Sequence, residues 1–322
     1  MDNLLIILSV VLVAAGITQV VRILELTFKM RGDDGKVNDR DNSVQGALML
    51  LWMFVMMGSF LWMWAKWGGD LLLPEPASAH GVQIDSLMSI TMGIILVVFF
   101  ITQPILFYFA WRYRGRKGNK AFFYSHNNKI ELVWTVVPAV VLTVLIVYGL
   151  NTWGNIMNAD TTNSTVVEFY ARQFDWTARL AGEDNVLGKA NIREIQGTNT
   201  VGADMDDPAS ADDMLVRGEI HIPVNQPYLF KFRSQDVIHS AYFPHFRMQM
   251  NCVPGMNTQF AFTPTKTTAE MRAITGNPEF NYILLCNKIC GAAHYNMQMT
   301  VVVDNEADYS AGLSEQTAMK DM

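Results

Sequence analysis

The stretch Cys286-Asn-Lys-Ile-Cys290-Gly-Ala-Ala-His294-Tyr-Asn-Met297 brings two thiols, an imidazole and a thioether into twelve consecutive residues. Strand-like runs flank it on both sides, so we expect it to form a loop between two strands. Thiolate and thioether are soft ligands, which select copper or an iron–sulfur cluster over hard cations. One Cys with His and Met would describe a single-copper site, and the second thiolate adds enough ligands to bridge a second copper. The stretch therefore predicts a copper-binding loop.

Three other interpretations of this loop are open. The thiols could form a disulfide, which is stable outside the cytoplasm. They could hold structural zinc, although zinc does not favour a Met ligand and its Cys pairs are usually two residues apart. A catalytic thiol would need only one Cys and would leave the second Cys and the Met without a role. Copper explains all four side chains.

Outward from this loop, the C-terminal half has the pattern of a β domain. Short runs rich in Val, Thr, Tyr and Phe alternate with Gly, Pro, Asn and Asp, which is typical of a β-sandwich or barrel. A polar, acidic stretch at 183–214 interrupts the pattern and indicates a surface insertion. The expected strands are 165–170, 173–180, 219–223, 226–233, 257–262, 282–285 and 297–303.

The N-terminal half predicts membrane helices, because spanning a bilayer takes about 20 mostly apolar residues. Aromatic residues crowd the ends of the apolar segments, as they do at membrane interfaces. A cleaved signal peptide is the alternative for the first segment, but no Lys or Arg precedes its apolar run. The four uncharged segments are 3–21, 42–65, 86–111 and 132–159.

The loops between these segments predict the orientation. Loops 22–41 and 112–131 carry five and six Lys or Arg residues, whereas loop 66–85 carries one. The positive-inside rule places the two basic loops in the cytoplasm. Both termini and the β domain are therefore expected on the outer face of the membrane.

The composition agrees with a membrane protein that has a large water-facing part. Half of the 322 residues are hydrophobic and 17% are charged, below the roughly 25% typical of soluble domains. Residues 160–322 contain 12 Lys or Arg against 20 Asp or Glu, a net charge of −8. This acidic balance excludes nucleic acid as a partner and favours a basic protein partner.

Further motifs define a resemblance. Residues 234–240 read Ser-Gln-Asp-Val-Ile-His-Ser, Pro254-Gly255 follows, and residues 126–138 read His-Asn-Asn-Lys-Ile-Glu-Leu-Val-Trp-Thr-Val-Val-Pro. Together with the Cys/His/Met loop, these stretches resemble subunit II of haem–copper cytochrome c oxidases over about residues 86–303. The resemblance implies a fold of membrane α plus all-β class, with the membrane helices followed by a cupredoxin-like Greek-key β-barrel. The first two helices have no counterpart in the common two-helix form of the family.

The resemblance and the hydropathy pattern together divide the chain into five parts. An extra N-terminal transmembrane hairpin and an external loop precede the helix pair of the subunit II type. The outer copper domain, which contains the insertion at 183–214, is followed by a polar tail. In order, these parts are residues 1–67, 68–85, 86–159, 160–303 and 304–322.

The same resemblance implies a binuclear copper centre, CuA. In the family, two cysteines bridge the coppers, two histidines bind one copper each, and a methionine and a backbone carbonyl complete the two shells. The corresponding residues here are Cys286 and Cys290, His239 and His294, Met297, and the carbonyl of Lys288. Glu131 corresponds to a carboxylate at the mouth of a proton-uptake path, although it could equally be a helix-start residue favoured by the dipole.

Two departures from the family pattern bear on function. The family usually has Glu at the position of Lys288, where that side chain binds a magnesium ion at the interface with subunit I. An ammonium cannot bind a cation, so we expect the magnesium site to be lost or rebuilt. The tryptophan through which the family receives electrons is replaced by Phe174, which leaves Trp176 as the nearest indole and as the candidate electron-accepting residue.

The resemblance implies the role of an oxidase subunit in a bacterial plasma membrane. An external cytochrome c, free or as a domain of a partner complex, would reduce CuA. The electrons would then pass to haem in subunit I, which also holds CuB, for reduction of oxygen to water and proton pumping. Other oxidase subunits and the lipid bilayer complete the expected partners. The alternatives are a CuA-bearing subunit of a nitric oxide reductase and a membrane-anchored copper carrier.

Overall fold

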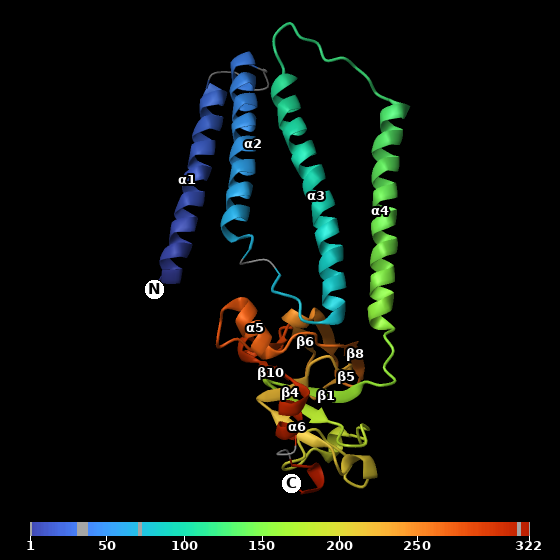
Figure 1. Cartoon of the computed structure of the whole chain (residues 1–322). Coiled ribbons are helices and arrows are strands. Elements are labelled where there is room, and N and C mark those ends of the chain that lie inside the picture. The colour runs from blue at the N-terminus through green and yellow to red at the C-terminus, as the bar shows by residue number, and fades with distance from the viewer. Residues whose placement is uncertain (1, 31–37, 70–72, 314–316, 322) are drawn as a thin grey trace. The chain divides into compact units, whose positions relative to one another are not determined.

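The computed structural model describes residues 2–30, 38–69, 73–313 and 317–321 (Figure 1). The chain divides into two compact units. One comprises residues 1–66 and 97–126, and the other comprises residues 67–96 and 127–322. The second unit contains the β domain together with the first part of the third helix and all of the fourth.

Four long helices confirm the expected membrane segments, because each is long and apolar enough to cross a bilayer. The first three helices extend beyond the predicted segments at both ends, since polar residues there continue the helical hydrogen bonding. The fourth begins before its predicted segment and ends at Met157, before the predicted end at 159. Pro104 and Pro138 lie inside the third and fourth helices. The bounds are α1 Asp2–Met30, α2 Asp39–Trp67, α3 Ala79–Arg112 and α4 Asn128–Met157.

In the first unit, the second half of α3 packs against α2. Gly46 lies against the Cα atom of Trp111, close enough that an added Cβ would lie 3.5 Å from it. The Phe60 ring contacts the rings of Phe99 and Phe100, with centroid distances of 5.9 and 5.6 Å. At the end of α3, the Asp39 carboxylate accepts a hydrogen bond from the Lys117 amide at 2.6 Å. The N-terminal hairpin is therefore attached through α2.

The second unit contains a β-sandwich of two five-stranded sheets, which confirms the cupredoxin-like domain. The sheet orders are β3-β2-β1-β5-β8 and β4-β10-β9-β6-β7. Each sheet contains one parallel pair, β1 with β5 and β10 with β4, among antiparallel neighbours. The bounds are β1 Thr165–Arg172, β2 Asp175–Leu180, β3 Met214–Arg217, β4 Glu219–Pro223, β5 Tyr228–Ser234, β6 His239–Phe243, β7 Met248–Cys252, β8 Thr258–Phe262, β9 Tyr282–Cys286 and β10 Gln298–Asp304.

An aromatic core fills the space between the two sheets. Phe169 on β1 contacts Phe230 on β5 and Phe243 on β6, with centroids 4.8 and 5.7 Å apart. All three rings are buried, and edge-to-face pairs of this kind add to the free energy gained from burying apolar area. This packing fixes the two sheets relative to each other. It therefore also fixes the loops at the ends of their strands.

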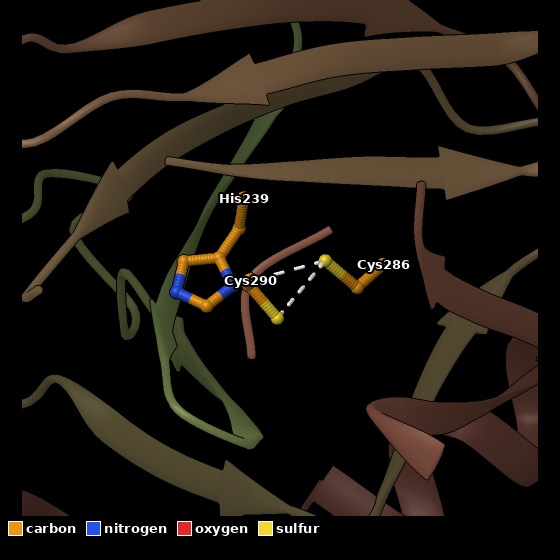
Figure 2. A group of neighbouring side chains, drawn as sticks. All are labelled: His239, Cys286 and Cys290. Carbon is orange, nitrogen blue, oxygen red and sulfur yellow. Dashed lines mark hydrogen bonds between the residues drawn. The ribbon is translucent and has the colours of Figure 1, made fainter. Parts of the chain in front are cut away.

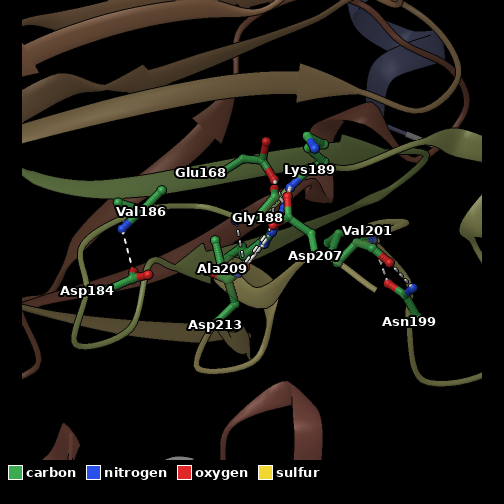
Figure 3. A network of polar contacts seen from close by, with 12 residues as sticks. Glu168, Asp184, Val186, Gly188, Lys189, Asn199, Val201, Asp207, Ala209 and Asp213 are labelled. Carbon is green, nitrogen blue, oxygen red and sulfur yellow. Dashed lines mark hydrogen bonds and ion pairs between the residues drawn. The ribbon is translucent and has the colours of Figure 1, made fainter. Parts of the chain in front are cut away.

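The acidic insertion is anchored to the sandwich by a buried ion pair (Figure 3). The guanidinium of Arg179 on β2 donates to the Asp213 carboxylate and to the Gly188 carbonyl, the latter at 2.7 Å. Arg233 on β5 makes two hydrogen bonds to Glu168, at 2.5 and 2.9 Å. The insertion is therefore more than the surface excursion that its polarity suggested, because it rests on a charged network beneath it.

The C-terminal tail is also folded over its described residues, although its polarity gave no sign of this. It contains the helix α6 (Glu306–Leu313) and a short 3-10 turn (Met319–Asp321). Met319 is buried, and its amide donates to the Asp213 carbonyl at 2.7 Å. The tail thus covers the anchored end of the insertion. A further short helix, α5 (Thr268–Thr275), precedes β9.

Candidate metal centre

Two neighbouring strands and the loop after them form the site (Figure 2). His239 opens β6 and Cys286 closes β9, and these strands pair antiparallel with Ala241 opposite Cys286. Because the strands run in opposite directions, the start of β6 and the end of β9 lie at the same edge of the sheet. The loop from Cys286 to Met297 then returns the second cysteine to this edge.

The Cys286 sulfur has three donor atoms around it. Its Sγ lies 3.7 Å from the Nδ1 atom of His239, 3.2 Å from the Lys288 carbonyl oxygen and 3.9 Å from the Sγ atom of Cys290. The ligand atoms of His239, Cys286 and Cys290 all lie within 4.8 Å of one another. One imidazole, one carbonyl and two sulfurs therefore surround a common point.

The Cys290 sulfur has a matching set. Its Sγ lies 3.6 Å from the Nδ1 atom of His294 and 3.8 Å from the Sδ atom of Met297. The structure thus brings together all six residues that the sequence singled out for copper. Each sulfur has its own imidazole and one weaker donor, so the arrangement is approximately two-fold.

The chemistry of this donor set suits soft metal ions. Cys286 and Cys290 are only 8% and 6% exposed, and both are free thiols. Burial, together with the adjacent Cys286, raises the pKa of Cys290 to about 11. Two buried thiolates at this distance need positive charge between them, and bound metal ions supply it. Sulfur, imidazole and thioether donors are those that copper selects, so the residues fit a copper pair.

Asp236 orients the first histidine. Its carboxylate accepts a hydrogen bond from the Nε2 atom of His239 at 2.8 Å and from the amides of Gln173 and Val237, each at 2.7 Å. Burial would raise the pKa of Asp236, but these hydrogen bonds outweigh it and hold the pKa below its usual value. A proton on Nε2 leaves the Nδ1 lone pair facing the sulfur, as metal-binding histidines require.

Gly291 lets a neighbouring loop approach the second cysteine. Its φ is +145°, and a Cβ atom there would lie 2.8 Å from both the Phe174 ring and the Gln173 amide nitrogen. The Gln173 side chain donates to the carbonyl of Cys290. Phe174 and Gln173 therefore cover the copper loop directly. Sequence reasoning missed Gln173 and Asp236, although Asp236 stands three residues before His239.

Trp176, the candidate electron-accepting residue, lies inside the sandwich. Its side chain is fully buried, and its ring centroid is 6.3 Å from that of His239. The five residues of β2 that follow Asp175 are all buried, and Trp176 is the first of them. The side chain has no exposed surface for direct contact with a donor protein, and the electron-entry role of Trp176 stays a prediction.

Glu131 lies in the first turn of α4 and closes that helix end. Its Oε1 atom accepts a hydrogen bond from the Asn127 amide at 3.0 Å, while the Asn127 side chain accepts one from Ile130 at 3.2 Å. This reciprocal pair satisfies free amides at the helix start. The proton-path role of Glu131 stays a prediction.

A cupredoxin-like sandwich joined to membrane helices, with a His/Cys/Cys group at one edge, defines a class of membrane-anchored cupredoxin-like domains. Two family models match the chain. The transmembrane domain of cytochrome c oxidase subunit II covers residues 65–152, and the periplasmic domain of the same subunit covers residues 171–305. The chain belongs to the cytochrome c oxidase subunit II family, and the sandwich corresponds to its periplasmic domain.

Individual relatives agree with this assignment. The alternative cytochrome c oxidase subunit 2 of Bradyrhizobium diazoefficiens is 32% identical over 274 residues, which is 84% of this chain and 92% of the relative. The cytochrome c oxidase subunit 2 of Synechocystis is 24% identical over 74% of each chain. Among solved structures, the periplasmic domain of cytochrome oxidase subunit II from Bradyrhizobium japonicum aligns over 48% of this chain and 93% of that domain, at 18% identity and a TM-score of 0.32.

Proposed function

We propose that this chain receives electrons from an external cytochrome c at a binuclear copper centre and passes them to haem in subunit I of the same oxidase. Its relatives are subunits of an oxidoreductase, so the chain acts as part of an enzyme complex. The observation that supports the proposal best is the paired donor set, in which each of the two cysteine sulfurs has its own imidazole.

A pair of copper ions held by these ligands would supply one-electron redox chemistry with little movement of the ligands. The protein's part is to keep those ligands fixed. Asp236 holds His239, Gln173 holds the Cys290 carbonyl, and the β6–β9 pairing holds Cys286. Such outer contacts set both ligand orientation and the reduction potential.

The remaining parts of the proposal follow from the family and the charge pattern. The relatives named above are bacterial, so we place the chain in a bacterial plasma membrane with both termini and the sandwich outside. Lys288 is exposed at the rim of the copper loop, and we propose that no magnesium ion is bound through its side chain. Trp176 is proposed to act inside the domain, next to His239, and Phe174 to lie nearer the donor.

Stopped-flow reduction of the assembled oxidase by a reduced cytochrome c tests this function. With the native chain, the copper absorption should change before the haem absorption. With Cys290→Ser, haem reduction should slow by at least about 100-fold, because the route through the copper pair is lost. Haem reduction at an unchanged rate in this variant would contradict the proposal. A copper carrier would show copper release without any electron transfer to haem.

A further inference from the structure

The segment before α3 is built into one corner of the sandwich. The Ala77 amide donates to the His245 carbonyl at 2.8 Å, and the Ser78 hydroxyl donates to the Phe246 carbonyl at 2.7 Å. Ala77 and Ser78 are fully buried. The corner that receives them is the 3-10 turn η3 (Pro244–Phe246), which connects β6 to β7.

Arg247, the residue after this turn, is the centre of the junction. Its guanidinium makes two parallel hydrogen bonds to the Asp85 carboxylate in α3, at 2.7 and 2.8 Å. It also donates to the carbonyls of Pro244, at 2.7 Å, and of Pro74. The Arg247 side chain is 6% exposed. A planar, two-pronged contact of this kind fixes both distance and angle, which a lysine cannot do.

The same hairpin leads from this junction to the copper ligands. In the β6–β7 pairing, Phe243 stands opposite Met248 at the turn, and His239 stands opposite Cys252 at the open end. One end of β6 therefore places His239 at the metal site. The other end leads into the turn that is hydrogen-bonded to the start of α3 and the segment before it. A short strand held within a sheet transmits position rigidly along its length.

The partners of Arg247 show what the junction is for. Asp85 and Pro74 lie outside the sandwich, in α3 and in the loop before it. Their hydrogen bonds therefore join the sandwich to the start of α3 and to the loop before it. The backbone of Arg247 has a φ of +53°, which is uncommon for a side chain of this size. That conformation turns the chain sharply after Phe246, where the turn meets α3.

We propose that Arg247, acting through Asp85, is a positioning residue that locks the copper-bearing hairpin to the start of α3. This contact keeps the metal site at one distance and one angle from the first turns of α3. The structural part of this inference stands on the contacts alone, and its consequence for electron transfer rests on the proposed function.

The experiment compares three variants of the full-length chain in its assembled oxidase. Asp85→Asn removes the negative charge that faces the Arg247 guanidinium. Arg247→Lys keeps the positive charge but cannot make the two parallel hydrogen bonds. Glu75→Gln is the matched control. It breaks the 2.6 Å ion pair with Lys266, which also joins this loop to the sandwich but is more exposed and does not touch α3.

The rate of amide hydrogen exchange and the rate of electron transfer from copper to haem are then measured for each variant. In Asp85→Asn and Arg247→Lys, exchange of the Ala77 and Ala79 amides should accelerate by about ten-fold or more, while Glu75→Gln should match the native chain. The rate from reduced copper to haem should fall by about three- to ten-fold with the copper spectrum and potential unchanged. Asp85→Glu, which restores the carboxylate, should recover part of both.

Each alternative outcome has a distinct meaning. Unchanged amide exchange in both Asp85→Asn and Arg247→Lys would overturn the proposed positioning contact. An equal acceleration of exchange in Glu75→Gln would overturn it too. Faster exchange with an unchanged electron-transfer rate would overturn its positioning role. A native complex without a copper signal would contradict the proposed function instead, and the exchange comparison would still decide whether the lock exists.

Discussion

Cys286 and Cys290 hold their sulfur atoms 3.9 Å apart, with the Nδ1 atom of His239 beside one sulfur and that of His294 beside the other. A disulfide bond would bring the sulfurs to about 2.05 Å. The observed spacing instead leaves room for metal ions between two buried thiolates. This relationship separates the copper interpretation from the disulfide interpretation more clearly than the sequence spacing did.

Asp236 should matter for copper affinity although it is not a ligand. In Asp236→Asn, His239 loses the carboxylate that selects its tautomer, and we expect copper affinity to fall by about 10- to 100-fold. Competition with a copper chelator measures this change. Asp175→Asn serves as the control, because that carboxylate faces Arg172 at 3.8 Å and is partly exposed. Equal copper affinity in the native protein and in Asp236→Asn would show that Asp236 does not orient His239 for copper binding.

The buried ion pair beneath the insertion should dominate its stability. Asp213→Ala leaves the Arg179 guanidinium buried without its main partner, which costs about 3 to 5 kcal/mol. Arg172→Gln, which breaks an exposed pair on β1, should cost less than about 1 kcal/mol. Thermal unfolding followed by near-UV circular dichroism compares them. Similar melting temperatures for the two variants would show that the insertion is not anchored through Arg179.

His221 predicts a pH-dependent contribution to stability. Its ring nitrogens lie 2.5 Å from Asp304 and 3.1 Å from Glu219, and both contacts are hydrogen bonds only when the ring is protonated. Burial lowers the pKa of His221, but these bonds outweigh it and raise the pKa above 6.5.

Stabilisation by His221 is therefore complete below about pH 6.5 and is lost as the pH rises through the raised pKa. The gain is at most about 1 kcal/mol, because the site is half exposed. His221→Gln should lower the melting temperature at pH 5.5 more than at pH 8.5. A difference in melting temperature between native protein and His221→Gln that grows with pH would contradict stabilisation by the protonated ring.

Lys288→Glu should change the metal content of the assembled complex. Replacing the ammonium by a carboxylate restores a group that binds hard cations, and we expect about one additional magnesium ion per complex by elemental analysis. The copper content should not change, because in the proposed site Lys288 would contribute only its backbone carbonyl, which lies 3.2 Å from the Cys286 sulfur. A native complex that already contains this magnesium would show that other groups rebuild the site.

The sequence predicted features that are local and missed those that depend on distant residues. The helices and the copper loop could be predicted because long apolar runs and closely spaced ligand residues are visible in short stretches of sequence. The strands β3 and β6 were missed because their residues do not alternate clearly between apolar and polar. The residues of β7 do alternate, but none of them is β-branched or aromatic, and tertiary pairing defines the strand. Burial of Trp176 and the contact between Asp85 and Arg247, 162 positions apart, depend on how the sheets fold together.

The most direct test is the copper content of the full-length chain together with its electron paramagnetic resonance spectrum. We predict two coppers per chain and a seven-line hyperfine pattern from one unpaired electron shared by both metals. Cys286→Ser should lose this pattern, whereas Cys252→Ala, which removes a buried thiol outside the ligand set, should keep it. A single copper with a four-line pattern, or no copper in the folded native chain, would contradict the binuclear centre and the electron-accepting function.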